Sequence, residues 1–222
     1  MAYKNSGYGL SSAPVSVLAH LLALAITSLL LAWLLHFRGG LSFDSINKQK
    51  IFNLHPLFMV IGFILMGGEA IMVYKTMAVK KEAQKATHWV LHLVALISGI
   101  IGIYAVFKFH NELHIPNVYT LHSWMGLVTI SLFGLQWILG FFSFVFPGSN
   151  GSSRTGFLPW HALLGAIIFL MAVCTAEMGI AEKFIFTGLK RAQEALVLNF
   201  TGLLIFLFAV CVGLAVILPS SF

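Results

Sequence analysis

The chain has 222 residues, of which 59% are hydrophobic and 9% charged, and its formal net charge is +6 at pH 7. A soluble core could not enclose so much apolar surface, so a soluble globular protein is excluded and an all-α polytopic membrane protein is predicted. Cys174 and Cys211 both fall within apolar segments, which predicts neither a disulfide nor a thiolate metal site.

Six apolar segments are long enough to cross about 30 Å of hydrocarbon as helices. They cover residues 14–37, 51–74, 88–107, 119–146, 158–180 and 195–218. The first is longer than the core of a secretory signal and no small-residue cleavage site follows it, so we expect it to be retained. The connections are too short for a soluble domain. We therefore expect a single transmembrane domain over residues 1–222.

Six crossings place both termini on one side of the membrane, called here the terminal face, with the opposite face beyond it. Charge counting does not orient the two faces. The terminal face carries Lys4, Lys75, Lys80, Lys81, Lys85 and Arg154, and the opposite face carries Arg38, Lys48, Lys50, Lys108, Lys183, Lys190 and Arg191. The positive-inside rule depends on an asymmetry that these counts lack. Acids dilute the opposite face more, which gives only a weak lean toward cytosolic termini.

Four of the nine histidines lie near the starts of the predicted helices. His55 and His122 enter from the opposite face, whereas His88 and His161 enter from the terminal face. The second and third helices are thereby repeated by the fourth and fifth, about an axis along the membrane normal. Two histidines at one depth on neighbouring helices can be the axial ligands of one haem iron. The pattern predicts a central four-helix bundle, helices two to five, that holds one haem toward each face.

A glycine follows two of these histidines by one helical turn. Gly126 follows His122, and Gly165 follows His161. The missing side chain leaves a flat patch that a planar porphyrin could approach.

Other interpretations of the histidines stay open. Any single one could be an interfacial residue bonded to water or backbone. Paired histidines also occur in metal or proton transporters, but those sites usually bring carboxylates at the same depth. We expect Glu69 and Glu177 to lie more than one turn from a paired histidine, which favours haem.

The histidine four residues after His88 raises a further choice. Either His88 or His92 could be the axial ligand, and we choose His88 because its depth matches that of His161. We expect His92 one turn deeper, toward the haem edge or a propionate. A packed polar residue is an equal alternative for His92. No chemistry is assigned to the remaining histidines of the first helix and the loops, which are His20, His36 and His114.

The chain resembles the cytochrome b561 family of transmembrane ascorbate-dependent oxidoreductases over nearly its whole length. The resemblance lies in Leu121-His122-Ser123-Trp124, in the four-histidine pattern and in the basic stretch of residues 74–85. It implies six helices, two b-type haems and a homodimer in a lipid membrane, with no nucleic-acid partner. It also implies cytosolic ascorbate as donor, an acceptor across the membrane, cytosolic termini and a vacuolar, vesicular or other endomembrane.

Cations on the terminal face suit an anionic donor, because ascorbate is a monoanion at neutral pH. Lys81 and Lys85 share a helix face if the third helix begins early. Arg154, predicted in the loop before the helix of His161, could close on the same spot and form an anion site over the haem edge. Loop topology or contact with lipid headgroups is the alternative for the lysines.

On the opposite face, His110 resembles the histidine with which the family binds its acceptor, either monodehydroascorbate or a ferric chelate. An imidazole can donate a hydrogen bond, exchange a proton or contact a metal. Asn117 and Tyr119 are further candidates for this acceptor site. A solvated loop histidine without such a role is the alternative.

Overall fold

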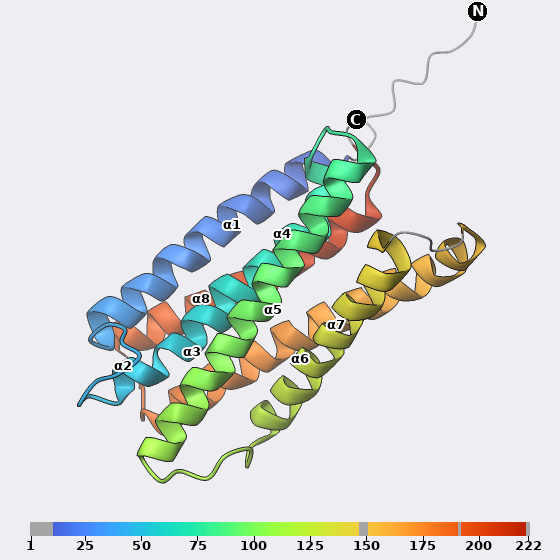
Figure 1. The fold of residues 1–222 in the computed structure, drawn as a ribbon. Helices are drawn as coiled ribbons and strands as arrows, with labels where there is room; N and C mark the ends of the chain where they lie inside the picture. The colour runs from blue at the N-terminus through green and yellow to red at the C-terminus, as the bar shows by residue number, and fades with distance from the viewer. Residues whose placement is uncertain (1–10, 147–150, 191, 221–222) are drawn as a thin grey trace, which may run out of the picture.

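A computed structural model describes residues 11–146, 151–190 and 192–220 (Figure 1). Within them, six helical spans are long and apolar enough to cross a membrane, and the all-α class is confirmed. The spans are Ser12–Phe37, Gln49–Thr76, Lys81–Glu112, Leu121–Val145, Arg154–Phe186 and Gln193–Ile217. Lys4 and Arg191, which entered the charge count, lie outside the described residues.

Three of the spans combine α-helical and π-helical segments. The first is α1 (Ser12–Ala32) and η1 (Trp33–Phe37), and the second is α2 (Gln49–Phe52), α3 (Leu54–Leu57), η2 (Phe58–Leu65) and α4 (Met66–Thr76). The fourth joins α6 (Leu121–Gly140) to η3 (Phe141–Val145). The others are the single helices α5 (Lys81–Glu112), α7 (Gly151–Phe186) and α8 (Gln193–Ile217). Pro56, beside His55, has no N–H to donate to the Phe52 carbonyl four positions back, which interrupts the hydrogen-bond ladder where α2 leads into α3.

The helix ends differ from the sequence-based boundaries in two places that matter for the site. The third helix begins at Lys81 rather than at residue 88 and continues to Glu112. The fifth begins before Arg154, so the prediction that this arginine lies in a loop is wrong. Apolar content identified the membrane-crossing part of each helix, but the polar turns that extend a helix into water carry no such signal.

The spans pack as two antiparallel hairpins and a flanking pair (Figure 1). The second span pairs with α5, and α6 pairs with α7. α1 lies along α8, which also contacts α4 and α7. The two described ends of the chain lie together, because the Ser12 N–H donates to the Pro219 carbonyl at 2.9 Å. Lys75 Nζ donates to the neighbouring Leu218 carbonyl at 2.7 Å.

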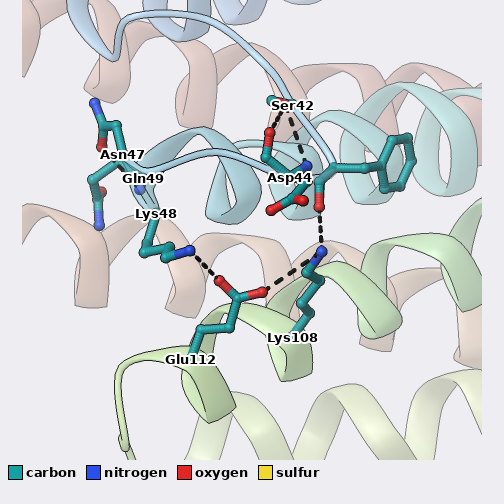
Figure 2. Close-up of polar contacts among 8 residues, drawn as sticks. Ser42, Asp44, Asn47, Lys48, Gln49, Lys108 and Glu112 are labelled. Atoms are coloured by element: carbon teal, nitrogen blue, oxygen red, sulfur yellow. Dashed lines mark hydrogen bonds and ion pairs between the residues drawn. The ribbon is translucent and has the colours of Figure 1, made fainter.

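The connection between η1 and α2 is fastened to the last turns of α5 on the opposite face. Figure 2 shows Glu112 between two lysines, at 2.6 Å from Lys48 and 3.6 Å from Lys108. Lys108 Nζ also donates to the Phe43 carbonyl at 2.6 Å. These contacts hold the start of α2 beside the end of α5. They therefore fix the segment that leads into α3, which carries His55.

Candidate functional site

The four predicted histidines form two pairs across the hairpins. The ring centroids of His55 and His122, the opposite-face pair, are 6.0 Å apart. Those of His88 and His161, the terminal-face pair, are 6.3 Å apart. A bond from imidazole to metal is about 2 Å long, and the ring centroid lies about 1 Å behind the nitrogen, so two axial imidazoles on one metal have centroids about 6 Å apart. Both separations fit a bis-histidine haem.

Backbone carbonyls fix the orientation of three of the four rings. His55 Nδ1 donates to the Gly102 carbonyl at 3.0 Å, and His122 Nδ1 donates to the Thr175 carbonyl at 2.9 Å. His88 Nδ1 donates to the Ala70 carbonyl at 2.8 Å. In each case Nδ1 carries the proton and Nε2 is left as the metal-binding atom, the usual arrangement for a ligating histidine.

The fourth ring, His161, differs from the other three. Its Nδ1 is buried and has no hydrogen-bond partner among the described residues. Gly140 lies beside it, and a Cβ added there would be 3.0 Å from His161 Cε1. Gly179 stands in the same relation to His122, at 2.7 Å. Each ring of the α6–α7 hairpin therefore packs against a glycine of the partner helix.

Gly126 and Gly165, which the sequence predicted to form flat patches beside His122 and His161, lie against other side chains of the partner helix. A Cβ at Gly126 would lie 3.5 Å from Thr175 Cγ2, and one at Gly165 would lie 3.4 Å from Gln136 Nε2. An added Cβ would make only ordinary van der Waals contact at both positions. Gly165 also lines the cavity described next, as expected for a patch that a porphyrin could contact.

A cavity of about 880 Å³ surrounds the terminal-face pair. Its volume is within the range of about 300–1,000 Å³ that is typical of cofactor sites. His88, His92 and His161 line it, together with residues without side chains, Gly67 and Gly140. The shape and the donor set therefore fit a haem between His88 and His161.

The three predicted donor-site cations line this same cavity. Lys81 and Lys85 occupy the first two turns of α5, one turn apart, and Arg154 lies in the first turn of α7. Lys85 Nζ donates to the Phe144 carbonyl in η3 at 3.0 Å. The structure thus brings two helix starts and the histidine pair to one cavity.

His92 lies one turn deeper than His88, with 4.4 Å between the two ring centroids. Its centroid is 5.4 Å from that of Phe133, and its Nδ1 is buried without a hydrogen bond among the described residues. This position agrees with the expectation of a residue near the haem edge. The choice of His88 stays a prediction; it is favoured by the 6.3 Å between the ring centroids of His88 and His161 and by the carbonyl partner of His88.

On the opposite face, the structure joins two of the three predicted acceptor residues. His110 lies in the last turn of α5, and its Nδ1 donates to Asn117 Oδ1 at 3.1 Å. Asn117 Nδ2 in turn donates to Asn111 Oδ1 at 2.8 Å. Tyr119 is 55% exposed and has no hydrogen bond to this group within the described residues.

We expected Glu69 and Glu177 to lie more than one turn from a paired histidine. This prediction is wrong, because each acid lies at the same depth as one pair. Glu69 immediately precedes Ala70, whose carbonyl holds His88, and Glu177 lies between Thr175 and Gly179, which hold His122. Both acids nevertheless face away from the histidine pairs. Glu69 Oε1 is 2.9 Å from His20 Nδ1 on α1, and Glu177 packs against Gly202 of α8. Helix spacing gives depth, but the facing direction depends on packing.

Sequence reasoning missed two polar groups, the His20–Glu69 pair and Lys183. His20 was given no role because the first helix has no counterpart in the repeat. Lys183 was counted only as a loop charge, although it follows Gly179 by four residues and so shares its helix face. That spacing was the available signal.

An all-α bundle of six spanning helices with a histidine pair toward each face defines a membrane-bound cytochrome of the b type. The family model for eukaryotic cytochrome b561 matches residues 54–187, which contain all four paired histidines. The chain belongs to the cytochrome b561 family.

Three relatives from plants and an animal span the chain. It is 48% identical to the probable ascorbate-specific transmembrane electron transporter 1 of Oryza sativa subsp. japonica, over 96% of this chain and 94% of that protein. It is 46% identical to transmembrane ascorbate ferrireductase 1 of Arabidopsis thaliana, over 93% and 87%. It is 38% identical to the transmembrane ascorbate-dependent reductase CYB561 of Ovis aries, over 87% and 78%.

Proposed function

We propose that this protein is an ascorbate-dependent transmembrane oxidoreductase. It transfers single electrons from ascorbate at the terminal face, through two b haems, to an acceptor at the opposite face. The acceptor is monodehydroascorbate or a ferric chelate. One observation carries the proposal: a single cavity contains the His88–His161 pair and three cations, Lys81, Lys85 and Arg154. The names of the relatives, which include an ascorbate electron transporter and an ascorbate ferrireductase, support the donor and the reaction class.

The cations of the terminal face bind and orient the donor. Two ammonium groups and one guanidinium supply charge-assisted hydrogen bonds to the ascorbate monoanion. Lys85 is held toward the cavity by its bond to the Phe144 carbonyl, so part of the site is formed before ascorbate arrives. Ascorbate leaves this site as the monodehydroascorbate radical anion after losing one electron to the terminal-face haem and one proton to water.

The histidine pairs hold the redox centres. Haem iron, when bound, supplies the one-electron chemistry. His55 and His122 would hold one haem toward the opposite face, and His88 and His161 would hold the other toward the terminal face. The carbonyls of Gly102, Ala70 and Thr175 fix ring orientation and make Nε2 the donor atom.

His110 receives the acceptor on the opposite face. Asn117 accepts the Nδ1–H bond of His110, so Nε2 remains available to accept a hydrogen bond from the acceptor or to contact a ferric ion. Tyr119 adds an exposed phenol nearby in sequence but has no fixed orientation within this group.

A transporter that uses the histidines without haem is not favoured. Glu69 and Glu177 have the right depth but point to α1 and α8, away from both pairs. In the part of the chain that the structure describes, no group of three or more metal-ligating side chains is found.

The visible spectrum of the purified protein tests the proposal. We expect two haems per chain, a bis-histidine spectrum, and a sharp reduced band when ascorbate is added. Protein that is free of haem, or haem that dithionite reduces and ascorbate does not, would contradict it. The homodimer, the cytosolic termini and the endomembrane location implied by the resemblance stay predictions.

A further inference from the structure

Lys183 lies one turn beyond the part of α7 that holds His122. The Thr175 carbonyl accepts the bond from His122, and Gly179 packs on the same ring. Because positions four apart share a helix face, Lys183 continues this row toward the end of α7 at the opposite face. It therefore lies between the opposite-face pair and water.

The ammonium of Lys183 reaches across to the helix that leads into His55. Its Nζ donates to Gln49 Oε1 at 3.1 Å and lies 4.0 Å from the ring centroid of Phe52. The Phe52 centroid is 6.2 Å from that of His55. The side chain thus connects α7, which packs on His122, with α2, which leads into His55.

This cation has no carboxylate partner among the described residues. The nearby acids of the same face have other partners: Glu112 pairs with Lys48 and Lys108, Glu194 pairs with Arg38, and Glu182 accepts a hydrogen bond from Thr120. An ammonium has three N–H donors, and Gln49 accepts only one of them. A partly buried cation without an anion is costly, so the arrangement suits an anion that arrives with a ligand.

We propose that Lys183, positioned by Gln49 and Phe52, binds a propionate carboxylate of the opposite-face haem. This inference rests on the proposed function, because it requires a haem between His55 and His122. Carboxylates avoid hydrocarbon, so the haem edge that carries them turns toward the water side of the pair, where the ammonium lies. A positive charge held there stabilises the reduced haem, which has gained an electron, and raises the reduction potential of that haem.

The test is an equilibrium redox titration of the two-haem protein, without ascorbate or acceptor. We compare Lys183→Gln, Lys183→Met and Lys183→Arg with the matched control Lys190→Gln, an exposed lysine in the connection after α7. Neutral residues at position 183 should lower the equilibrium constant for reduction of the opposite-face haem about tenfold, which lowers its reduction potential by about 59 mV for one electron. The terminal-face haem should not shift. Arginine should keep most of the wild-type value, and Lys190→Gln should change neither haem.

Each other outcome is decisive. Unchanged potentials in a neutral variant that retains both haems would overturn the propionate contact. A shift seen only after an anionic acceptor is added would also overturn it and assign Lys183 to the acceptor. Loss of the opposite-face haem alone would support the proposal, because the anchor of that haem is gone. Loss of both haems would make Lys183 a structural residue. Wild-type protein without two haems would contradict the proposed function instead.

Discussion

The two histidine pairs are alike in spacing and different in how firmly they are held. On the opposite face, both His55 and His122 donate to backbone carbonyls. On the terminal face, His88 has such a bond and the buried Nδ1 of His161 has none among the described residues. The opposite-face pair is therefore fixed from both sides, whereas the terminal-face pair is fixed from one.

The surroundings of the two pairs also differ, with more open space around the terminal-face pair. A cavity of about 880 Å³ lies around the terminal-face pair, with His92 deep in it and cations along its wall. On the side of the opposite-face pair, an ion pair and a hydrogen bond fasten the connection between η1 and α2 to α5 (Figure 2). This contrast fits the proposal that a substrate anion binds at the terminal face, while the opposite-face histidines keep one orientation. If the terminal-face pair receives electrons from the donor and the opposite-face pair passes them on, mutations in the two sites should have different effects.

Loss of a ligand should have the largest effect. His55→Ala or His122→Ala should remove the opposite-face haem and leave the other, and His88→Ala or His161→Ala should do the reverse, because one missing axial ligand releases a haem. Haem content per protein and the reduced spectrum measure this. His92→Ala is the matched control and should keep both haems. If His92→Ala loses the terminal-face haem while His88→Ala retains it, the ligand assignment is wrong.

Removing donor-site cations should have the next largest effect. Replacing two of Lys81, Lys85 and Arg154 with glutamine should slow reduction by ascorbate at least tenfold, since a hydrogen bond to a charged group contributes about 1.5–3 kcal/mol. Part of the loss should remain at high salt, where merely screened surface attraction disappears. Stopped-flow reduction by dithionite is the control and should be unchanged. Equal losses with both reductants would mean that the haem site itself was damaged.

The number of spans was predictable from the length of the apolar segments, and the histidine pairing from positions counted along each helix. His55 and His88 could be matched with His122 and His161 by counting residues from helix starts. What counting could not provide is the direction in which a side chain faces. Glu69 and Glu177 share the depth of the pairs, yet only the packing of α1 and α8 shows that they face away.

The polar ends of the helices were also beyond what the sequence could predict. Lys81 and Arg154 are helical because each helix extends beyond the membrane-crossing part, and hydropathy has no signal for those turns. The spacing of Lys183 from Gly179 could have given its helix face, but its contacts could not be predicted. Its environment consists of Gln49 and Phe52, which precede it by more than 130 positions, and only the folded chain brings them together.

Two glycines offer a direct comparison of the two pairs. Gly179→Ala puts a methyl group 2.7 Å from His122 Cε1, and the Thr175 bond prevents that ring from yielding. Gly140→Ala puts one 3.0 Å from His161 Cε1, a ring whose Nδ1 has no hydrogen bond among the described residues. We expect Gly179→Ala to lower occupancy of the opposite-face haem severalfold, and Gly140→Ala to change its haem little. Equal losses, measured as haem content, would mean that the two rings are held alike.

The acceptor side should respond separately from the donor side. His110→Ala should leave the reduction of haem by ascorbate nearly unchanged and slow re-oxidation by a ferric chelate several-fold, because only that step uses the imidazole. Stopped-flow measurements on vesicles loaded with acceptor separate the two phases, and a small outer-sphere oxidant is the control. Slowing of the first phase alone would place His110 on the donor side and reverse the assignment of the faces.

The smallest expected effect concerns the His20–Glu69 pair, which lies behind the helix turn that holds His88. Its 2.9 Å contact ties α1 to α4 within the membrane. Such contacts contribute only about 0.6–1.7 kcal/mol, because the unfolded chain in a membrane also finds partners. A double-mutant cycle with His20→Leu and Glu69→Leu, read from unfolding in mixed micelles, should therefore give a coupling free energy of about 1 kcal/mol. Glu69→Gln, which keeps a hydrogen-bond acceptor, should lose less stability than Glu69→Leu.

If the terminal-face pair depends on this support through Ala70, Glu69→Leu should also shift the spectrum of that haem and leave the opposite-face haem unchanged. A coupling near zero together with a shifted spectrum would mean that Glu69 acts on His88 without His20.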